Sequence, residues 1–103
     1  MWAQLIKTRL RPGHEDGLKR LSEQLRAFEQ PGSGLVRSTA MRDQKDPSQV
    51  YMLVVFESEE KAREREKSRA SQEGFETVRA TMGEIFEGPP EFVDLLVVEE
   101  TTP

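Results

Sequence analysis

Two short segments of the chain are apolar at almost every position, and they predict buried β-strands. They run from Val50 to Phe56 and from Phe92 to Val98. Successive side chains of a strand point to opposite faces of its sheet, so these strands need apolar cover both above and below. An antiparallel sheet in a small domain usually needs cover on one face only. The chain therefore has one apolar sheet face more than its own helices are expected to cover.

Periodic apolar positions elsewhere predict two helices with one apolar stripe each. The first is expected to begin at a polar segment near His14 and to extend over about 15 residues. The segment 61–69 has almost no apolar residue and predicts a solvated helix, with Ser58 as its N-cap. The first stripe is Leu18, Leu21, Leu25 and Phe28, and the second is Phe75, Val78, Met82, Ile85 and Phe86. Strands are predicted over 2–11, 35–42, 49–57 and 91–99.

This order of elements is typical of a ferredoxin-like α+β domain, a four-stranded antiparallel sheet with its helices on one face. Two apolar stripes can cover one face of that sheet. At about 25 cal/mol per Å², the burial of even five large apolar side chains on the other face is worth several kcal/mol. We therefore expect residues 1–103 to form one domain that dimerises through its sheet face. The alternative is a monomer with an exposed apolar sheet, which is prone to aggregation.

Composition limits the classes of partner. The chain of 103 residues is 35% hydrophobic and 33% charged, which is polar for a domain that must build its own core. The net charge is −4 with both signs interspersed, so we expect neither nucleic acid nor a membrane as partner. The absence of cysteine excludes disulfides, thiolate nucleophiles and cysteine metal sites. With no leader and no apolar run near 20 residues, a cytoplasmic protein is expected.

Three turn and cap motifs resemble those of the antibiotic biosynthesis monooxygenase-like group of dimeric α/β-barrel proteins. They are RLRPG at residues 9–13, VVFESEE at 54–60 and EGPP at 87–90. The resemblance covers nearly the whole chain and implies a dimeric α/β barrel with a ligand pocket between the sheet and the helices of each subunit. The group includes cofactor-free oxygenases of polycyclic phenols and quinones, haem-degrading enzymes, and members with no assigned activity.

The haem-degrading branch of this group can be compared residue by residue. It uses an asparagine on the first strand, with a tryptophan and a histidine ligand on the later helices. Ungapped matching places Thr8, Arg65 and Arg79 at these positions. An arginine cannot ligate iron as a neutral imidazole does, so the sequence argues against haem degradation.

Asp94 is the candidate catalytic residue, because it interrupts an otherwise apolar strand on the face of Phe92 and Leu96. An isolated buried carboxylate is costly, so this group must be paired, hydrogen-bonded or close to solvent. It could serve as the base that deprotonates a phenol. It could equally pair with an arginine of the second strand, for example Arg37, or lie at a bulge.

Trp2, Thr8 and Tyr51 are the candidate ligand-pocket residues. Trp2 and Tyr51 are the only indole and the only phenol, and Trp2 shares a strand face with Thr8. The resemblance implies that aromatic and polar pocket residues orient a substrate that is itself the electron donor. For Trp2, packing at the pocket rim or at the dimer seam is the alternative.

Two other groups of polar residues favour structural roles. His14 lies beside Glu15 and Asp16, but three neighbouring side chains cannot all point at one ion, so a surface residue at a helix start is favoured. Arg65, Arg69 and Arg79 could form a rim for an acidic ligand. The glutamates interleaved with them favour a solvated face of salt bridges instead. No metal site is predicted.

Two functions stay open at this point. The first is an oxygenase-like enzyme that needs no metal or organic cofactor and acts on a small aromatic or polyketide-like ligand, with Asp94 as base. The second is a non-catalytic dimeric module that binds a small apolar ligand. The scarcity of acid–base groups favours the second function, and the family resemblance favours the first.

Overall fold

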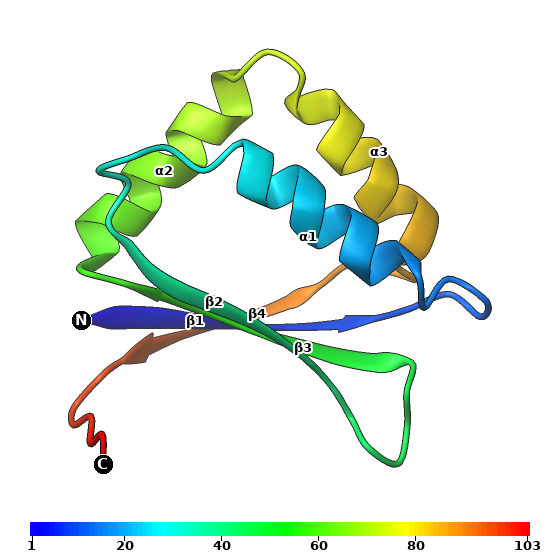
Figure 1. The fold of residues 1–103 in the computed structure, drawn as a ribbon, viewed down its shortest axis with the longest axis horizontal. Coiled ribbons are helices and arrows are strands. Elements are labelled where there is room, and N and C mark those ends of the chain that lie inside the picture. Colours follow the sequence, from blue (N-terminus) through cyan, green and yellow to red (C-terminus); the bar gives the residue numbers. More distant parts are fainter.

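The structure, a computed structural model, describes all 103 residues and consists of a four-stranded antiparallel sheet with three helices on one of its faces (Figure 1). The strand order is β2-β3-β1-β4. The elements are β1 (Trp2–Arg9), α1 (Gly17–Ala27), β2 (Leu35–Arg42), β3 (Gln49–Phe56), α2 (Glu59–Ser71), α3 (Phe75–Ile85) and β4 (Glu91–Leu96). This confirms the ferredoxin-like α+β fold. Within the single chain the sheet is open and is not closed into a barrel.

The start of α1 and the ends of β1 and β4 were predicted to extend further than they do in the structure. The polar segment from His14 to Asp16 is a turn, in which the carbonyl of His14 accepts from the N–H of Gly17, so α1 begins three residues later. β1 ends at Arg9, and Leu10 makes only an isolated bridge. β4 ends at Leu96, which pairs with Trp2 at the start of β1, because no further strand residue remains there to pair with.

The strand register decides which face meets the helices. Trp2 lies opposite Phe56 on one side and Leu96 on the other, and Thr8 lies opposite Val50. Because pairing partners share a face, the even-numbered side chains of β1, β3 and β4 all point toward the helices. Tyr51 and its odd-numbered neighbours point to the opposite face.

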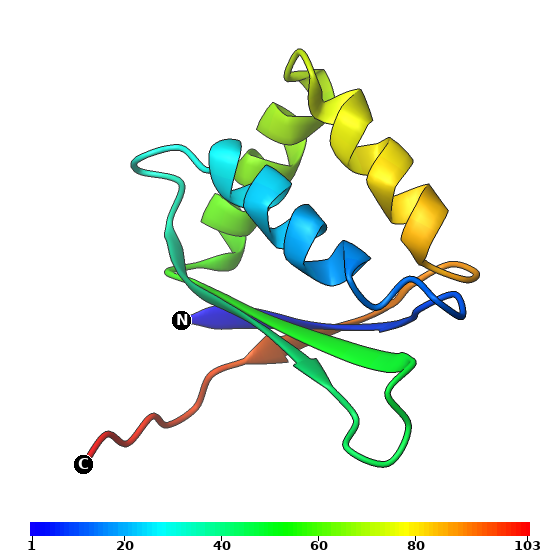
Figure 2. The ribbon, with the colours of Figure 1, turned by 45° about the vertical axis from the view of Figure 1, so that its right-hand side comes forward.

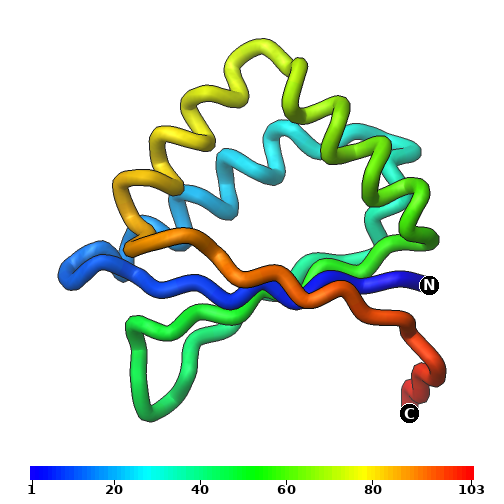
Figure 3. Tube along the Cα trace, turned by 180° about the vertical axis from the view of Figure 1, so that it is seen from behind, coloured from blue at the N-terminus to red at the C-terminus, as the bar shows by residue number.

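The core on the helix side is divided into two clusters. The larger one lies under α1 and α3, and the smaller one lies under α2. The buried members of the first are Leu10, Leu21, Val50, Phe75, Val78 and Ile85, and those of the second are Trp2, Phe56 and Ala62. All nine residues of the two predicted stripes belong to the first cluster or pack against it. Between the clusters the sheet is incompletely covered, since Phe92 is 56% exposed. The helices α2 and α3 diverge toward the sheet on this side (Figure 3).

The charged helix α2 explains this incomplete cover. Ser58 caps it, since its Oγ accepts from the N–H of Lys61 at 3.2 Å, and Arg63 pairs with Glu59 at 3.2 Å, both as predicted. Ala62 is the only residue that α2 buries. A helix without large apolar side chains lies over the sheet but cannot fill the space beneath it.

The other face of the sheet has no helix over it. The segment after β4 leaves the sheet on this side (Figure 2), where Glu100 pairs with Arg37 at 2.9 Å. Away from this segment the face carries apolar side chains that are half-buried or exposed, namely Leu5, Met41, Leu53, Val93 and Leu95. The single chain therefore has an apolar sheet face that none of its helices covers. None of the helices has the length and apolar character needed to cross a membrane.

Candidate functional site

The space between the sheet and the diverging helices contains two adjoining hollows, which we call together the sheet–helix cleft. Both are lined by Ile6 and Phe92 from the sheet and by Met82 from α3, so they meet at these side chains. Phe92 is 56% exposed although it is on the helix side of the sheet. The cleft therefore exists because no helical side chain covers the middle of β1 and β4.

The apolar hollow lies at the end of β1 where α3 approaches the sheet, and its volume is about 480 Å³. Its lining is mostly apolar, with Met52 and Phe86 beside the three shared side chains. Thr8 and Arg11 supply its only polar side chains. A pocket of this size and character suits a small, largely apolar ligand.

The arginine-lined hollow is the other part of the cleft, with a volume of about 440 Å³. Trp2 and Phe56 form its end beneath α2, and Gln4 lies on its floor. Arg63, Arg65 and Arg69 enter it from α2, and Arg79 enters it from α3. The cleft thus has an apolar part and a cationic part.

Two of the three predicted pocket residues line this cleft. Trp2 is buried, with its ring 6.2 Å from that of Phe56 and 5.2 Å from the guanidinium of Arg63. Thr8 is 5% exposed, and its Oγ1 has no hydrogen-bond partner in the protein. Tyr51 does not line the cleft, because its odd position in β3 places it opposite Lys7 on the other face of the sheet, and it meets Thr8 only at a separate polar groove.

Asp94 lies at the rim of the cleft. It shares the face of Phe92 and Leu96, which is the helix side of β4, but it lines neither hollow. Its carboxylate accepts from Gln4 Nε2 at 2.9 Å and from Arg63 Nη2 at 3.0 Å. The suggested partner Arg37 was wrong, because β2 and β4 are opposite edges of the sheet. Hydrogen bonds to Glu59, and then to Asp94, raise the pKa of Arg63.

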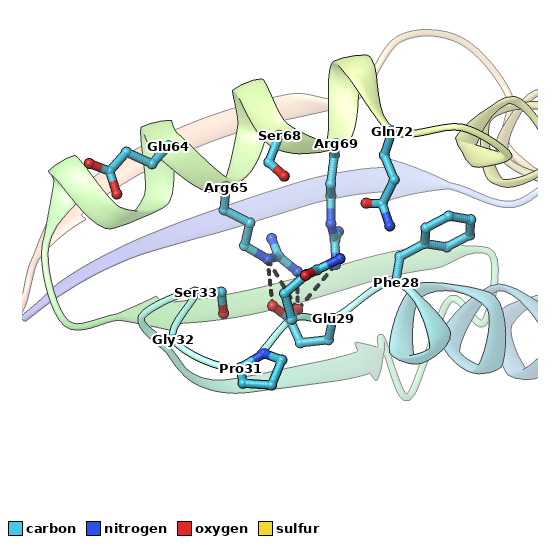
Figure 4. Close-up of a pocket in the computed structure, with 11 residues that line it drawn as sticks. Phe28, Glu29, Pro31, Gly32, Ser33, Glu64, Arg65, Ser68, Arg69 and Gln72 are labelled. Carbon is cyan, nitrogen blue, oxygen red and sulfur yellow. Dashed lines mark hydrogen bonds and ion pairs between the residues drawn. The ribbon is translucent and has the colours of Figure 1, made fainter.

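A carboxylate that the sequence did not single out organises α2. Glu29, in the connection after α1, accepts from Arg65 Nη2 at 2.7 Å and from Arg65 Nε at 3.1 Å (Figure 4). Arg69 Nη2 donates to the same carboxylate at 3.1 Å. The three side chains are only 13 to 23% exposed. This cluster ties the end of α1 to α2 beside a small polar groove of about 210 Å³.

The environment shifts the pKa values of this cluster. Burial alone would raise the pKa of Glu29, but hydrogen bonds from Arg65 and Ser33 and the charges of Arg65 and Arg69 outweigh it and lower that pKa from 4.5. Burial, together with the charge of Arg65, lowers the pKa of Arg69 to about 10, although Glu29 acts in the opposite direction. One carboxylate thus binds two guanidinium groups, and its charge offsets only part of the effect of burial on the pKa of Arg69.

The expectation that interleaved glutamates neutralise these arginines was wrong. Neither Arg65 nor Arg69 pairs with a glutamate of its own helix, and both pair with Glu29 instead. Arg79 has no carboxylate within 4.0 Å and lies over the ring of Phe75, 5.3 Å from its centroid. The spacing of four between Arg65 and Arg69 was the only sequence signal for their shared partner, because Glu29 is 36 residues away from Arg65.

Comparison with solved structures shows the same fold in proteins of low sequence identity. SnoaB, a cofactor-independent oxygenase from Streptomyces nogalater, is 16% identical, with a TM-score of 0.74 over 96% of this chain and 94% of that one. Rv0793 from Mycobacterium tuberculosis is 15% identical, with a TM-score of 0.74 over 98% of each chain. PA3566 from Pseudomonas aeruginosa is 15% identical, with a TM-score of 0.71 over 95% of this chain and 94% of that one.

Comparison with curated proteins gave no match. A family model described as antibiotic biosynthesis monooxygenase matches residues 1–79, which include the first three strands, α1, α2 and the start of α3. The chain therefore belongs to the antibiotic biosynthesis monooxygenase family.

Proposed function

We propose that this protein is a cofactor-independent monooxygenase that oxidises a small aromatic or polyketide-like ligand in the sheet–helix cleft. The apolar hollow of about 480 Å³, with the unpartnered hydroxyl of Thr8 in its wall, is the observation that carries this proposal. A buried hydroxyl without a partner costs about 1–3 kcal/mol, and a ligand oxygen beside it would recover part of that cost. Family membership and the shared fold with SnoaB add support.

The reaction needs electrons from the ligand itself. A deprotonated phenol is electron-rich and reacts with O2 without a bound metal. For a methylene between two aromatic rings, one atom of O2 becomes the new carbonyl oxygen. The other atom leaves as water with the two hydrogens of the methylene, so atoms and electrons balance.

Three of the four candidate residues have a definite role in this reaction. Thr8 donates to or accepts from a ligand oxygen, and Trp2 packs against the ligand at the arginine-lined end. Asp94 takes the phenolic proton at the rim, which requires Arg63 to release the Oδ2 that it now holds at 3.0 Å. Tyr51 has no role inside the cleft of its own subunit, because it lies on the other sheet face.

A non-catalytic ligand carrier of the same fold is the second candidate. The observation in its favour is that only Thr8 and Arg11 among the side chains of the apolar hollow are polar, so no free base touches a ligand there. Asp94 is the only carboxylate at the helix-facing positions of β1, β3 and β4, and two hydrogen bonds already engage it. Binding without turnover would identify this function.

Oxygen uptake distinguishes the two candidates. The purified protein, with EDTA present, is mixed with a neutral hydroxyanthrone, and O2 consumption and formation of the quinone are followed together. We expect one O2 consumed per quinone formed, and a loss of at least about 100-fold in rate for Asp94→Asn. The matched control is Asp16→Asn, since Asp16 is exposed and forms no ion pair. Binding of the anthrone with no uptake above background would overturn the monooxygenase proposal.

We further propose that the open face of the sheet is covered by a second copy of the chain. Its half-buried and exposed apolar side chains, such as Leu53 and Leu95, form the surface that an isologous dimer would bury. Native mass spectrometry of the purified protein tests this directly and reports any retained ligand as well. A monomer of 11.8 kDa at micromolar concentration would contradict it.

A further inference from the structure

Helix α2 is attached to the rest of the fold in a different way from α1 and α3. Those two helices pack their apolar stripes into the larger core cluster, whereas α2 contributes Ala62 alone to the smaller one. The next positions on the same helical face, four and eight residues later, are Glu66 and Ala70. Both line the arginine-lined hollow and leave it open. The apolar packing that normally fixes a helix to its sheet is therefore largely missing from α2.

Arginine side chains connect α2 to the rest of the fold instead. Three of its guanidinium carbons lie 5.2 to 5.6 Å from the centroids of buried aromatic rings: Arg63 over Trp2, Arg65 over Phe56 and Arg69 over Phe75. The same arginines form the ion pairs of α2 with other elements, Arg63 with Asp94 and the other two with Glu29 (Figure 4). Such contacts are weaker than buried apolar packing, so a helix that depends on them opens more readily.

Both ends of α2 are suited to act as hinges. Its N-cap Ser58 has an extended backbone, with φ −156° and ψ 162°. At the other end Gln72 is also extended, and Gly74 has a left-handed backbone with φ +88° just before α3 begins. Hinges are typically a few residues of this kind at the ends of elements. α3 itself stays anchored, because its buried apolar residues belong to the larger core cluster.

α2 also covers one end of the sheet–helix cleft. It lies over the end of the sheet where β1 begins (Figure 1). Ala62 and three arginines line the arginine-lined hollow from this helix, and Trp2 and Phe56 line it from the sheet. Movement of α2 away from the sheet would therefore open this hollow, and with it the apolar hollow that adjoins it.

We propose that α2 is a lid on the cleft, which opens as a unit between Ser58 and Gly74 while the sheet, α1 and α3 stay folded. The Glu29 cluster is the main latch. Arg69 lies about 16 Å along the helix axis from Ser58, so its contact with Glu29 resists rotation about that end with a long lever arm. Opening also separates Arg63 from Asp94 and frees that carboxylate at the rim. The lid does not depend on whether the cleft catalyses a reaction.

Native-state hydrogen exchange of the intact protein measures this opening. Exchange is followed by NMR at low urea concentrations, at the amides of residues 63–69 in the middle of α2 and at the buried amides of α3. We expect the α2 amides to exchange at least about tenfold faster than those of α3. Their urea dependence should be smaller, because opening of the lid exposes less surface than global unfolding. Fraying of the helix ends would not give the middle amides one shared free energy of opening.

Two variants test the latch. Glu29→Gln should accelerate exchange of the α2 amides about 30-fold, because four hydrogen bonds to this carboxylate break when the lid opens. The matched control is Glu84→Gln, which removes an exposed ion pair with Arg20 at 3.1 Å that joins α1 to α3 and not to α2. It should change α2 exchange by less than about twofold.

A third variant tests the missing apolar anchor. Ala70→Leu places a large apolar side chain in the wall of the arginine-lined hollow and should slow exchange of the α2 amides about tenfold. Its control is Ala80→Leu, which adds the same side chain at an exposed position of α3 and should have no such effect. Thermal unfolding shows that each variant is folded under the conditions of exchange.

Three results would each overturn the lid. They are α2 amides that exchange no faster than those of α3, equal effects of Glu29→Gln and Glu84→Gln, and no slowing by Ala70→Leu relative to Ala80→Leu. None of them decides the proposed function, because O2 uptake from the hydroxyanthrone is measured separately. Conversely, opening of α2 in a protein that consumes no O2 would retain the lid and remove the oxygenase.

Discussion

Replacement of Glu29 by glutamine tests the cluster that joins α1 to α2. The substitution keeps the shape of the side chain but removes its charge and turns one oxygen into an N–H donor. Arg65 and Arg69 together donate four hydrogen bonds of 2.7 to 3.1 Å to the Glu29 carboxylate. In Glu29→Gln one guanidinium loses its acceptor and faces an amide donor, while both cations lose their counter-charge.

The magnitude follows from the exposure of the three side chains. Breaking a fully buried ion pair by removal of one partner costs about 3–5 kcal/mol, whereas exposed pairs contribute about 0–1 kcal/mol. The side chains of Glu29, Arg65 and Arg69 are 23%, 18% and 13% exposed, which is nearer to the buried limit. Because water still reaches them, we expect Glu29→Gln to lower the free energy of unfolding by about 2 kcal/mol. For a domain of this size the melting temperature should fall by roughly 10 °C.

Urea and thermal unfolding at one fixed protein concentration measure this loss. The control is Glu64→Gln, because Glu64 lines the same groove in Figure 4, is exposed and forms no ion pair. It should change stability by less than about 0.5 kcal/mol. A Glu29→Gln variant as stable as this control would refute the reasoning.

The pH dependence adds a second check. The folded-state pKa of Glu29 lies below its ordinary value of 4.5, so the folded protein holds the charged form more favourably than the unfolded chain does. Its stabilisation is therefore complete above about pH 4.5 and disappears as the pH falls through the lower, folded-state pKa. The difference in stability between the wild type and Glu29→Gln should shrink in acid. A difference that stays constant down to pH 3 would contradict the assignment.

Three further changes have defined outcomes. Leu53→Lys places a charge in the open sheet face and should convert the proposed dimer to a monomer in sedimentation velocity; an unchanged dimer would exclude this face as the interface. Gly34→Ala should cost about 2 kcal/mol in urea unfolding, because φ is +83° and the new Cβ would overlap the Lys61 side chain; a neutral result would contradict the backbone geometry. Thr8→Val should leave stability unchanged or raise it by up to about 1 kcal/mol while weakening binding of the hydroxyanthrone, and a clear loss of stability would show that its hydroxyl already has a partner.

The elements of the fold were largely predictable, because short-range patterns determine them. The apolar run of β3 and the cap at Ser58 depend on neighbours within a few residues, and both lie where the pattern placed them. The face of the sheet that meets the helices was not predictable. Val54 and Val55 are equally apolar, so hydrophobicity alone could not choose between the even and odd positions. The register with Trp2 and Thr8, which also pack under the helices, makes that choice.

The partners in the site were less predictable, because they join distant segments. The pair of Arg63 with Glu59 was found since it lies within one helical turn. The partner of Asp94 was missed, although the predicted fold already excluded Arg37. In a ferredoxin-like sheet the second and fourth strands are the two edges, and residues on them cannot touch. The expected topology therefore already indicated that the partner of Asp94 lies on a helix above the sheet and not on the second strand.

The composition of α2 accounts for both parts of the cleft. Ala62 is its only buried residue, so the helix has no large apolar side chain to place on the sheet, and the floor at Phe92 stays 56% exposed. Its arginines are long enough to lie against the aromatic rings below while their charged ends stay near solvent. The same residues that leave the cavity open therefore make one end of it cationic. A stretch that reads as an ordinary solvated helix is, in this fold, what gives the cleft its space and its charge.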